Sequence, residues 1–136
     1  MEELRKWADE FSQGSPWIGL VFTGFVRSRT ERENVDYIAK FLEKRLGERI
    51  GFFHGQLPKA TRDNVMKLLY RVSEGAVKEP RIIVCTKAFG MGVDIPNIRW
   101  IVHYMMPETI EEYYQEIGRG GRDGEYCGAI MLYQPG

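Results

Sequence analysis

The sequence predicts an α/β domain in which a mainly parallel sheet is flanked by helices on both faces. Short apolar runs rich in β-branched and aromatic residues alternate along the chain with segments of helical hydrophobic spacing. These runs lack a polar face, which is typical of parallel strands that are covered on both sides. With 136 residues, the chain has the length of one domain, and we expect that domain to span residues 1–136.

Each element can be placed in order along the chain. Leu4, Trp7, Ala8 and Phe11 share one side of an N-terminal segment, which predicts an amphipathic helix over residues 1–12. Strands are expected over residues 17–23, 49–54, 81–86, 98–104 and 126–133. Further helices are expected from Thr30 to Gly47, from Pro58 to Gly75 and over about 108–117. Strands that alternate with helices in this way pair in parallel.

Composition excludes several classes of protein. Two cysteines cannot build a disulfide framework or a four-cysteine zinc site. No apolar run approaches the roughly 18 residues that span a membrane, and the N-terminus lacks the apolar core of a signal peptide. Nineteen basic and nineteen acidic residues give zero net charge. The neutrality is a cancellation, because residues 57–87 carry 7 − 3 = +4 and residues 94–126 carry 3 − 7 = −4. It therefore does not exclude a nucleic-acid partner.

One loop after a predicted strand carries an unusual group of residue types. The stretch CTKAFGMGVD, residues 85–94, contains two glycines, a hydroxyl, a lysine and a carboxylate. Ligands of open parallel sheets bind at the carboxyl ends of the strands. Gly90 and Gly92 let the backbone approach a phosphate closely, Thr86 can donate to a phosphate oxygen, and Asp94 can accept from a ribose hydroxyl. An ordinary glycine turn explains this loop equally well.

A second loop, QEIGRGGRDG over residues 115–124, places Arg119 and Arg122 on a glycine-rich backbone. A guanidinium offers a planar fork that binds phosphate bidentately. An arginine that one domain delivers to a phosphate held by another is called an arginine finger. Two solvated surface arginines are the simpler interpretation of this loop when it is taken alone.

Taken together, the two loops resemble motifs V and VI of the RecQ-type DNA helicases. The AFGMG-D and QxxGRxGRDG cores stand in the same order, and the neighbouring HY and YYQE are typical of RecQ. RIGFFHGQLPKATRDNVMKLL also resembles the family's segment between motifs IV and V. The resemblance covers roughly residues 17–133 and implies a three-layer RecA-like domain, the second of two motor lobes. The stretch GFVRSRT, residues 24–30, is longer than the family leads us to expect.

The resemblance also implies roles for individual residues. Arg119 and Arg122 would face the γ-phosphate of ATP, bound with Mg²⁺ mainly by the first lobe, and Arg122 is favoured as the finger. Gln115 would couple the nucleotide to the arginines and the DNA, and Gly92 and Asp94 would lie at the nucleotide edge. DNA-backbone contacts would come from Ser28, Arg29, His54, Gly55, Thr86 and Lys87. No metal ligand is expected. The implied partners are the first lobe and single-stranded or forked DNA, unwound 3′ to 5′.

Two motifs of a complete motor do not occur in these 136 residues. There is no G-x-x-x-x-G-K-[ST] segment to hold the β- and γ-phosphates, and there is no DExH segment. We therefore expect the chain alone to have neither ATPase nor unwinding activity. Two alternatives stay open. One is the corresponding lobe of a DEAD-box RNA helicase, against which Gln115 and AFGMG argue. The other is a non-catalytic module that docks nucleic acid or a partner protein. The family would act in the nucleoid of a prokaryote or the nucleus of a eukaryote.

Overall fold

The computed structural model describes residues 1–23, 35–86, 95–104 and 116–131. Its helices within these ranges are α1 (Glu2–Ser12), α2 (Val35–Leu46) and α3 (Lys59–Ser73). Its strands are β1 (Ile18–Phe22), β2 (Ile50–Phe53), β3 (Ile82–Cys85), β4 (Ile98–His103) and β5 (Gly128–Met131). Every predicted strand is therefore present, within two residues of its expected bounds. The expected start of the second helix and most of the expected helix 108–117 lie outside the described residues. No described helix is long and apolar enough to cross a membrane.

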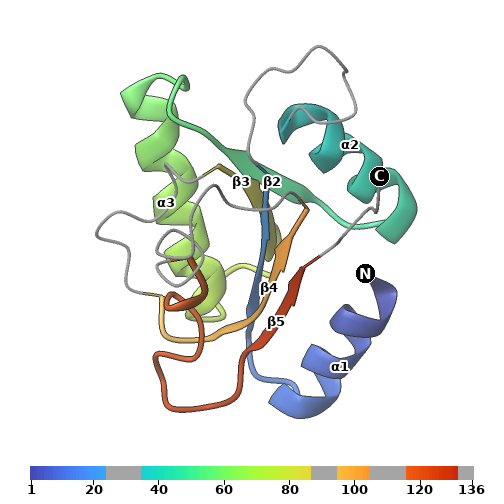
Figure 1. Ribbon diagram of the computed structural model, residues 1–136. Coiled ribbons are helices and arrows are strands. Elements are labelled where there is room, and N and C mark those ends of the chain that lie inside the picture. Colours follow the sequence, from blue (N-terminus) through green and yellow to red (C-terminus); the bar gives the residue numbers. More distant parts are fainter. Residues whose placement is uncertain (24–34, 87–94, 105–115, 132–136) are drawn as a thin grey trace.

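The strands form one sheet in the order β2-β3-β1-β4-β5, and every neighbouring pair is parallel (Figure 1). The three central strands, β3, β1 and β4, are buried along their whole length. Burial on both faces explains why their sequences are continuously apolar rather than alternating. The predicted fold class, a parallel sheet between helical layers, is confirmed.

Helices cover the two faces of the sheet separately (Figure 1). On one face, α1 and α2 pack against side chains that include Val21, Val84 and Val102. On the other face, α3 packs through Leu69 and Val72 against a second apolar cluster. The three central strands contribute alternate residues to the two clusters because successive strand side chains point to opposite faces. The result is a three-layer sandwich with the sheet in the middle.

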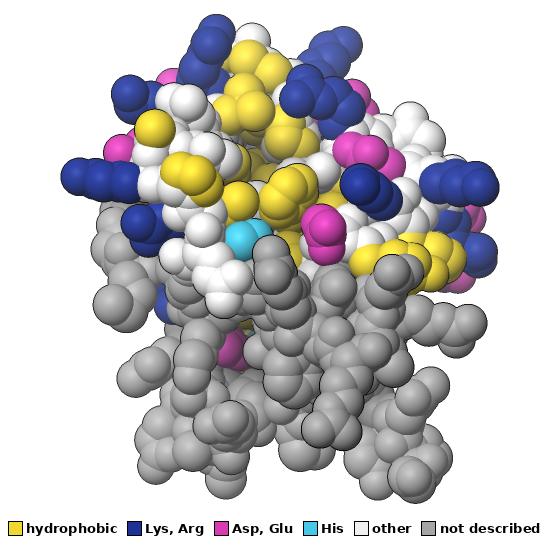
Figure 2. Space-filling model, turned by 90° about the horizontal axis from the view of Figure 1, so that it is seen from above, with side chains coloured by type: hydrophobic (Ala, Val, Ile, Leu, Met, Phe, Trp, Pro, Cys, Tyr) yellow, Lys and Arg dark blue, Asp and Glu magenta, His cyan; other side chains and the backbone are white. Residues whose placement is uncertain are grey.

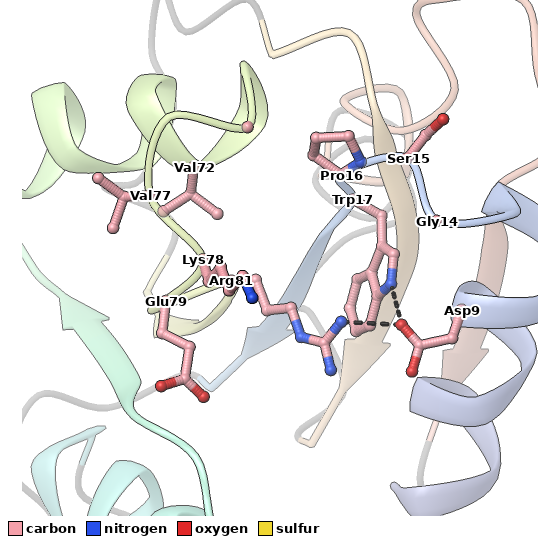
Figure 3. A pocket seen from close by; sticks show the side chains of 11 residues that line it. Asp9, Gly14, Ser15, Pro16, Trp17, Val72, Val77, Lys78, Glu79 and Arg81 are labelled. Carbon is pink, nitrogen blue, oxygen red and sulfur yellow. Dashed lines mark hydrogen bonds and ion pairs between the residues drawn. The ribbon is translucent and has the colours of Figure 1, made fainter.

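A cluster of charged and aromatic side chains ties α1 to the amino ends of β1 and β3 (Figure 3). The Trp17 indole N–H donates to Asp9 at 2.8 Å, and the Arg81 guanidinium lies 4.2 Å from the centre of the Trp17 ring. Arg81 also donates to Asp9 at 2.8 Å and to Glu48 at 3.1 and 3.2 Å. Asp9, Trp17 and Arg81 line a pocket of about 610 Å³. The pocket lies at the opposite end of the strands from the loops in which the sequence predicts ligand binding.

Candidate functional site

The strands finish level with one another, which creates one continuous carboxyl edge. Neighbouring strands pair in register at their last residues, in the order Phe53, Cys85, Phe22, His103 and Met131. The ladder continues one residue further, because the Thr23 N–H donates to the Cys85 carbonyl at 2.9 Å and the Thr86 N–H donates to the Phe53 carbonyl at 3.2 Å. Both threonines are buried. Two hydroxyl-bearing residues therefore lie side by side at the predicted ligand edge.

His54 and Gly55 open a tight turn directly after β2, next to Thr86. The Leu57 N–H donates to the His54 carbonyl at 3.3 Å, and the Gln56 N–H donates to His54 Nδ1 at 3.1 Å. The His54 ring also stacks on Phe52, with 6.3 Å between ring centres. His54 is therefore a structural element of its turn, and the turn presents Gly55 to solvent. The structure thus brings three sequence-predicted residues, His54, Gly55 and Thr86, to adjoining strand ends.

The surface around this edge carries many basic side chains. Figure 2 looks down from above Figure 1, onto the end of the sheet toward which the strands run. Lysine and arginine side chains project around the described part of this surface, and apolar side chains occupy its middle. Acidic side chains lie among them, so the described surface is mixed in charge (Figure 2). Its lysines and arginines can contact phosphates without reading the base sequence.

A buried polar pair joins the end of β4 to the start of the arginine-bearing loop. His103 Nε2 lies 2.6 Å from Glu116 Oε2, and the side chains of the two residues are only 1% and 10% exposed. The His103 ring stacks on Phe22, at 5.3 Å between ring centres and 12° between ring planes. Residues 116 and 117 are helical, which agrees with the predicted end of a helix at 117.

Arg119 lies in the turn that follows this helical end. Its N–H donates to the Glu116 carbonyl at 3.3 Å, and the residue is half-buried. Burial lowers the pKa of Arg119, and the neighbouring charge of Arg122 acts in the same direction, whereas Cys85 and Glu116 oppose the shift. The Arg119 guanidinium therefore lies within electrostatic range of the carboxyl edge, near the end of β3.

Arg122 is exposed, and the backbone on both sides of it is fixed against the start of β4. The Gly121 N–H donates to the Ile98 carbonyl at 3.2 Å, and the Asp123 N–H donates to the Pro96 carbonyl at 3.1 Å. Gly121 has a φ of +64°, a left-handed conformation that favours glycine. Arg122 is thus displayed to solvent on a loop whose backbone is held in place.

The anchor of this loop is Arg99, a charged residue inside the buried strand β4. Its side chain is 3% exposed and forms an ion pair with Asp123, the Asp of the predicted GRGGRDG loop. It also donates to the Tyr126 carbonyl at 2.7 Å. Inside the loop, a Cβ on Gly120 would lie 2.2 Å from Cys127 Sγ, so only glycine fits there without displacement. These contacts make the loop a preformed structure.

Several predicted site residues cannot be placed. Ser28, Arg29, Lys87, Gly92, Asp94 and Gln115 lie outside the described residues. Within the described ranges, no group of three or more His, Cys, Asp or Glu side chains could hold a metal ion.

Sequence reasoning missed three residues that organise the site, namely Arg99, His103 and Glu116. One signal was available for Arg99, because a charge within a buried strand needs a partner. Its partner lies 24 positions away in the sequence, and no local pattern identifies it. The His103–Glu116 pair is equally non-local, because it depends on how the helical end packs over β4.

The sequence matches a known domain family over most of its length. Residues 5–124 match the helicase conserved C-terminal domain. The chain is 37% identical over 99 residues to the probable ATP-dependent DNA helicase RecS of Bacillus subtilis, which covers 73% of this chain and 19% of RecS. It is 34% identical over 135 residues to the ATP-dependent DNA helicase RecQ of the same organism, covering 98% of this chain and 21% of RecQ. The chain thus spans about a fifth of the length of these relatives.

The fold matches solved helicase lobes. Domain 2 of the DEAD-box helicase Mss116p, solved bound to an RNA duplex, superposes with a TM-score of 0.71 at 22% identity. The match covers 96% of this chain and 46% of that one. At this level of identity, the likeness establishes the RecA-like architecture alone.

Proposed function

The chain belongs to the helicase conserved C-terminal domain family, and from this premise we propose that it is the second motor lobe of an ATP-dependent DNA helicase of RecQ type. Its relatives in Bacillus subtilis, RecS and RecQ, are DNA helicases by name. In this proposal the first lobe binds ATP with Mg²⁺, and this chain supplies arginines to the phosphates and contacts to the DNA backbone. The protein would act where chromosomal DNA lies, in a nucleoid or a nucleus.

The observation that carries the proposal is the preformed arginine loop. An arginine finger stabilises charge on the transferring phosphoryl group, and it is effective only when its position is fixed before the reaction. Arg122 is exposed on a backbone that is bonded to Ile98 and Pro96, so it can reach a phosphate held by another lobe. Arg119 lies closer to the sheet and would contribute a second charge. Gln115, Gly92 and Asp94 complete the nucleotide edge in this proposal.

DNA would lie along the carboxyl edge. Thr86 and the His54–Gly55 turn adjoin there, and the proposal adds Ser28, Arg29 and Lys87 from the neighbouring loops. Hydroxyl, basic and backbone N–H groups of these residues would bind phosphate oxygens, which are the same in every DNA sequence. Binding would therefore be independent of sequence and sensitive to salt.

The lobes would convert hydrolysis into movement along DNA. ATP between the lobes draws them together, because the first lobe holds its phosphates and the arginines of this lobe attract its γ-phosphate. Hydrolysis and phosphate release remove that attraction, and the lobes separate. Each cycle then advances one lobe relative to the other along the strand. We propose that this movement runs 3′ to 5′ and unwinds duplex DNA, as the resemblance to the RecQ-type helicases implies.

We expect single-stranded DNA, and not RNA of the same sequence, to stimulate ATP hydrolysis by the protein that joins this chain to a P-loop lobe. The measurement is the steady-state ATPase rate at rising concentrations of each nucleic acid, repeated at higher salt, where stimulation by DNA should weaken. Equal stimulation by RNA would favour a lobe of an RNA helicase. No stimulation by either, with ATP still bound, would favour a non-catalytic docking module.

A further inference from the structure

A side-chain hydrogen bond joins the end of β4 to the start of the arginine-bearing loop, between two residues for which the sequence predicts no role. His103 Nε2 and Glu116 Oε2 are 2.6 Å apart and buried. His103 is the last residue of β4, and it is paired in register with Phe22 of β1, against whose ring it stacks. The histidine, which donates to the Glu116 carboxylate, is therefore fastened to two neighbouring strands of the sheet, β4 and β1.

Glu116 also contacts Arg119. Its carbonyl accepts the Arg119 N–H at 3.3 Å, while its carboxylate is held by His103. The same carboxylate lies within electrostatic range of Arg119 and opposes the lowering of the Arg119 pKa. One residue thus connects the central sheet, through its side chain, to the backbone of the first arginine.

We propose that His103 and Glu116 are a positioning pair that sets the place of Arg119 relative to the sheet. The inference rests on the proposed function, since it assumes that Arg119 acts on ATP. The bond links the helical end that bears Glu116 to the central sheet, and a small shift of this end would also move Arg119. A displacement of about 1 Å at a reacting centre can cost roughly 10²-fold in rate.

Stability alone is a poor explanation for this pair. A buried charged or polar pair loses the hydration of both groups, and a well-packed apolar pair of similar volume is often as stable. Both residues are buried and the His103 ring stacks on Phe22, so an apolar contact would fit the site chemically. What an apolar contact lacks is direction, and a 2.6 Å hydrogen bond supplies it.

The test is a double-mutant cycle in the protein that joins this chain to a P-loop lobe. Glu116→Met removes the bond at similar volume, and Glu116→Gln keeps an acceptor for His103. Each is combined with Arg119→Ala and, separately, with Arg122→Ala. The measurements are kcat and KM for ATP in the presence of DNA, together with the melting temperature.

We expect Glu116→Met to lower kcat by about 10²-fold with little change in KM, and Glu116→Gln to restore most of the rate. In a protein that already carries Arg119→Ala, adding Glu116→Met should lower kcat no further. In a protein that carries Arg122→Ala, it should still lower kcat by the same factor as in the wild type. Equal losses on both backgrounds would show a general structural effect and overturn the inference, as would an unchanged kcat for Glu116→Met.

If Glu116→Met does not fold, His103→Phe takes its place, because it keeps the ring stack on Phe22 and removes the same hydrogen bond. Its loss of kcat should likewise disappear when Arg119→Ala is already present. The inference and the proposed function fail differently. If Arg119→Ala alone leaves kcat unchanged, the role of Arg119 in the proposed function is wrong. If Arg119→Ala lowers kcat and neither bond-removing variant does, only the positioning pair is wrong.

Discussion

Replacing Arg122 with alanine is expected to lower the rate of ATP hydrolysis by about 10³–10⁵-fold in the protein that joins this chain to a P-loop lobe. The guanidinium would meet negative charge that develops on the phosphoryl group only as the reaction proceeds. Its loss should therefore lower kcat and leave nucleotide binding nearly intact. Steady-state ATPase rates and the Kd of a non-hydrolysed ATP analogue measure the two effects separately.

Two further variants sharpen this prediction. Arg122→Lys keeps the charge and loses the planar fork, so it should recover only part of the rate. Arg45 is an exposed arginine on α2, far from the loop in sequence, and Arg45→Ala is the matched control. If Arg122→Ala hydrolyses ATP at the rate of the Arg45→Ala control, Arg122 is not the arginine finger.

Replacing Asp123 with alanine is expected to cost about 3 kcal/mol of folding free energy, because it leaves the Arg99 guanidinium buried without its carboxylate. The loop that displays Arg122 should loosen at the same time. Urea denaturation measures the loss. Asp63→Ala, at an exposed position on α3, is the control and should change stability by less than about 1 kcal/mol.

The folding free energy lost in Asp123→Ala should become smaller as the pH falls. Burial alone would raise the pKa of Asp123, but the hydrogen bond and charge of Arg99 outweigh burial and hold that pKa below its ordinary value. The stabilisation is therefore present above the unfolded pKa of about 3.9 and is lost as the pH falls through the folded pKa. The wild-type protein and Asp123→Ala should converge in acid. A stability loss no larger than that of Asp63→Ala at neutral pH would contradict the anchoring role of Asp123.

The fold could be predicted because its signals are local. The segments around Leu20, Val84 and Ile101 are apolar on both faces, and that pattern identifies buried parallel strands without knowledge of their partners. The spacing of Ile38, Leu42 and Leu46 likewise identifies the buried face of α2. The order of strands in the sheet has no such local signal, because it depends on pairing between segments that are distant in sequence.

The candidate site could be predicted only in part. The glycine-rich loop with Arg119 and Arg122 was visible as a motif, and the family match over residues 5–124 confirms the resemblance on which its interpretation was based. The roles of the individual residues stay predictions. What holds the loop was not visible, because Arg99, His103 and Glu116 act through contacts between residues 13 or more positions apart. Pairs of this kind become apparent only when the chain is folded.

In the proposed function, this chain supplies arginines to a nucleotide that it does not itself hold. The most direct measurement is the ATPase rate of the chain mixed with a separately produced P-loop lobe in the presence of DNA. We expect hydrolysis in the mixture, no hydrolysis above background by the chain alone, and loss of the restored activity when the chain carries Arg119→Ala and Arg122→Ala. Two results would contradict this proposal. One is ATP turnover by the isolated chain well above that of the double variant, and the other is restored ATPase activity that is unchanged when both arginines are replaced.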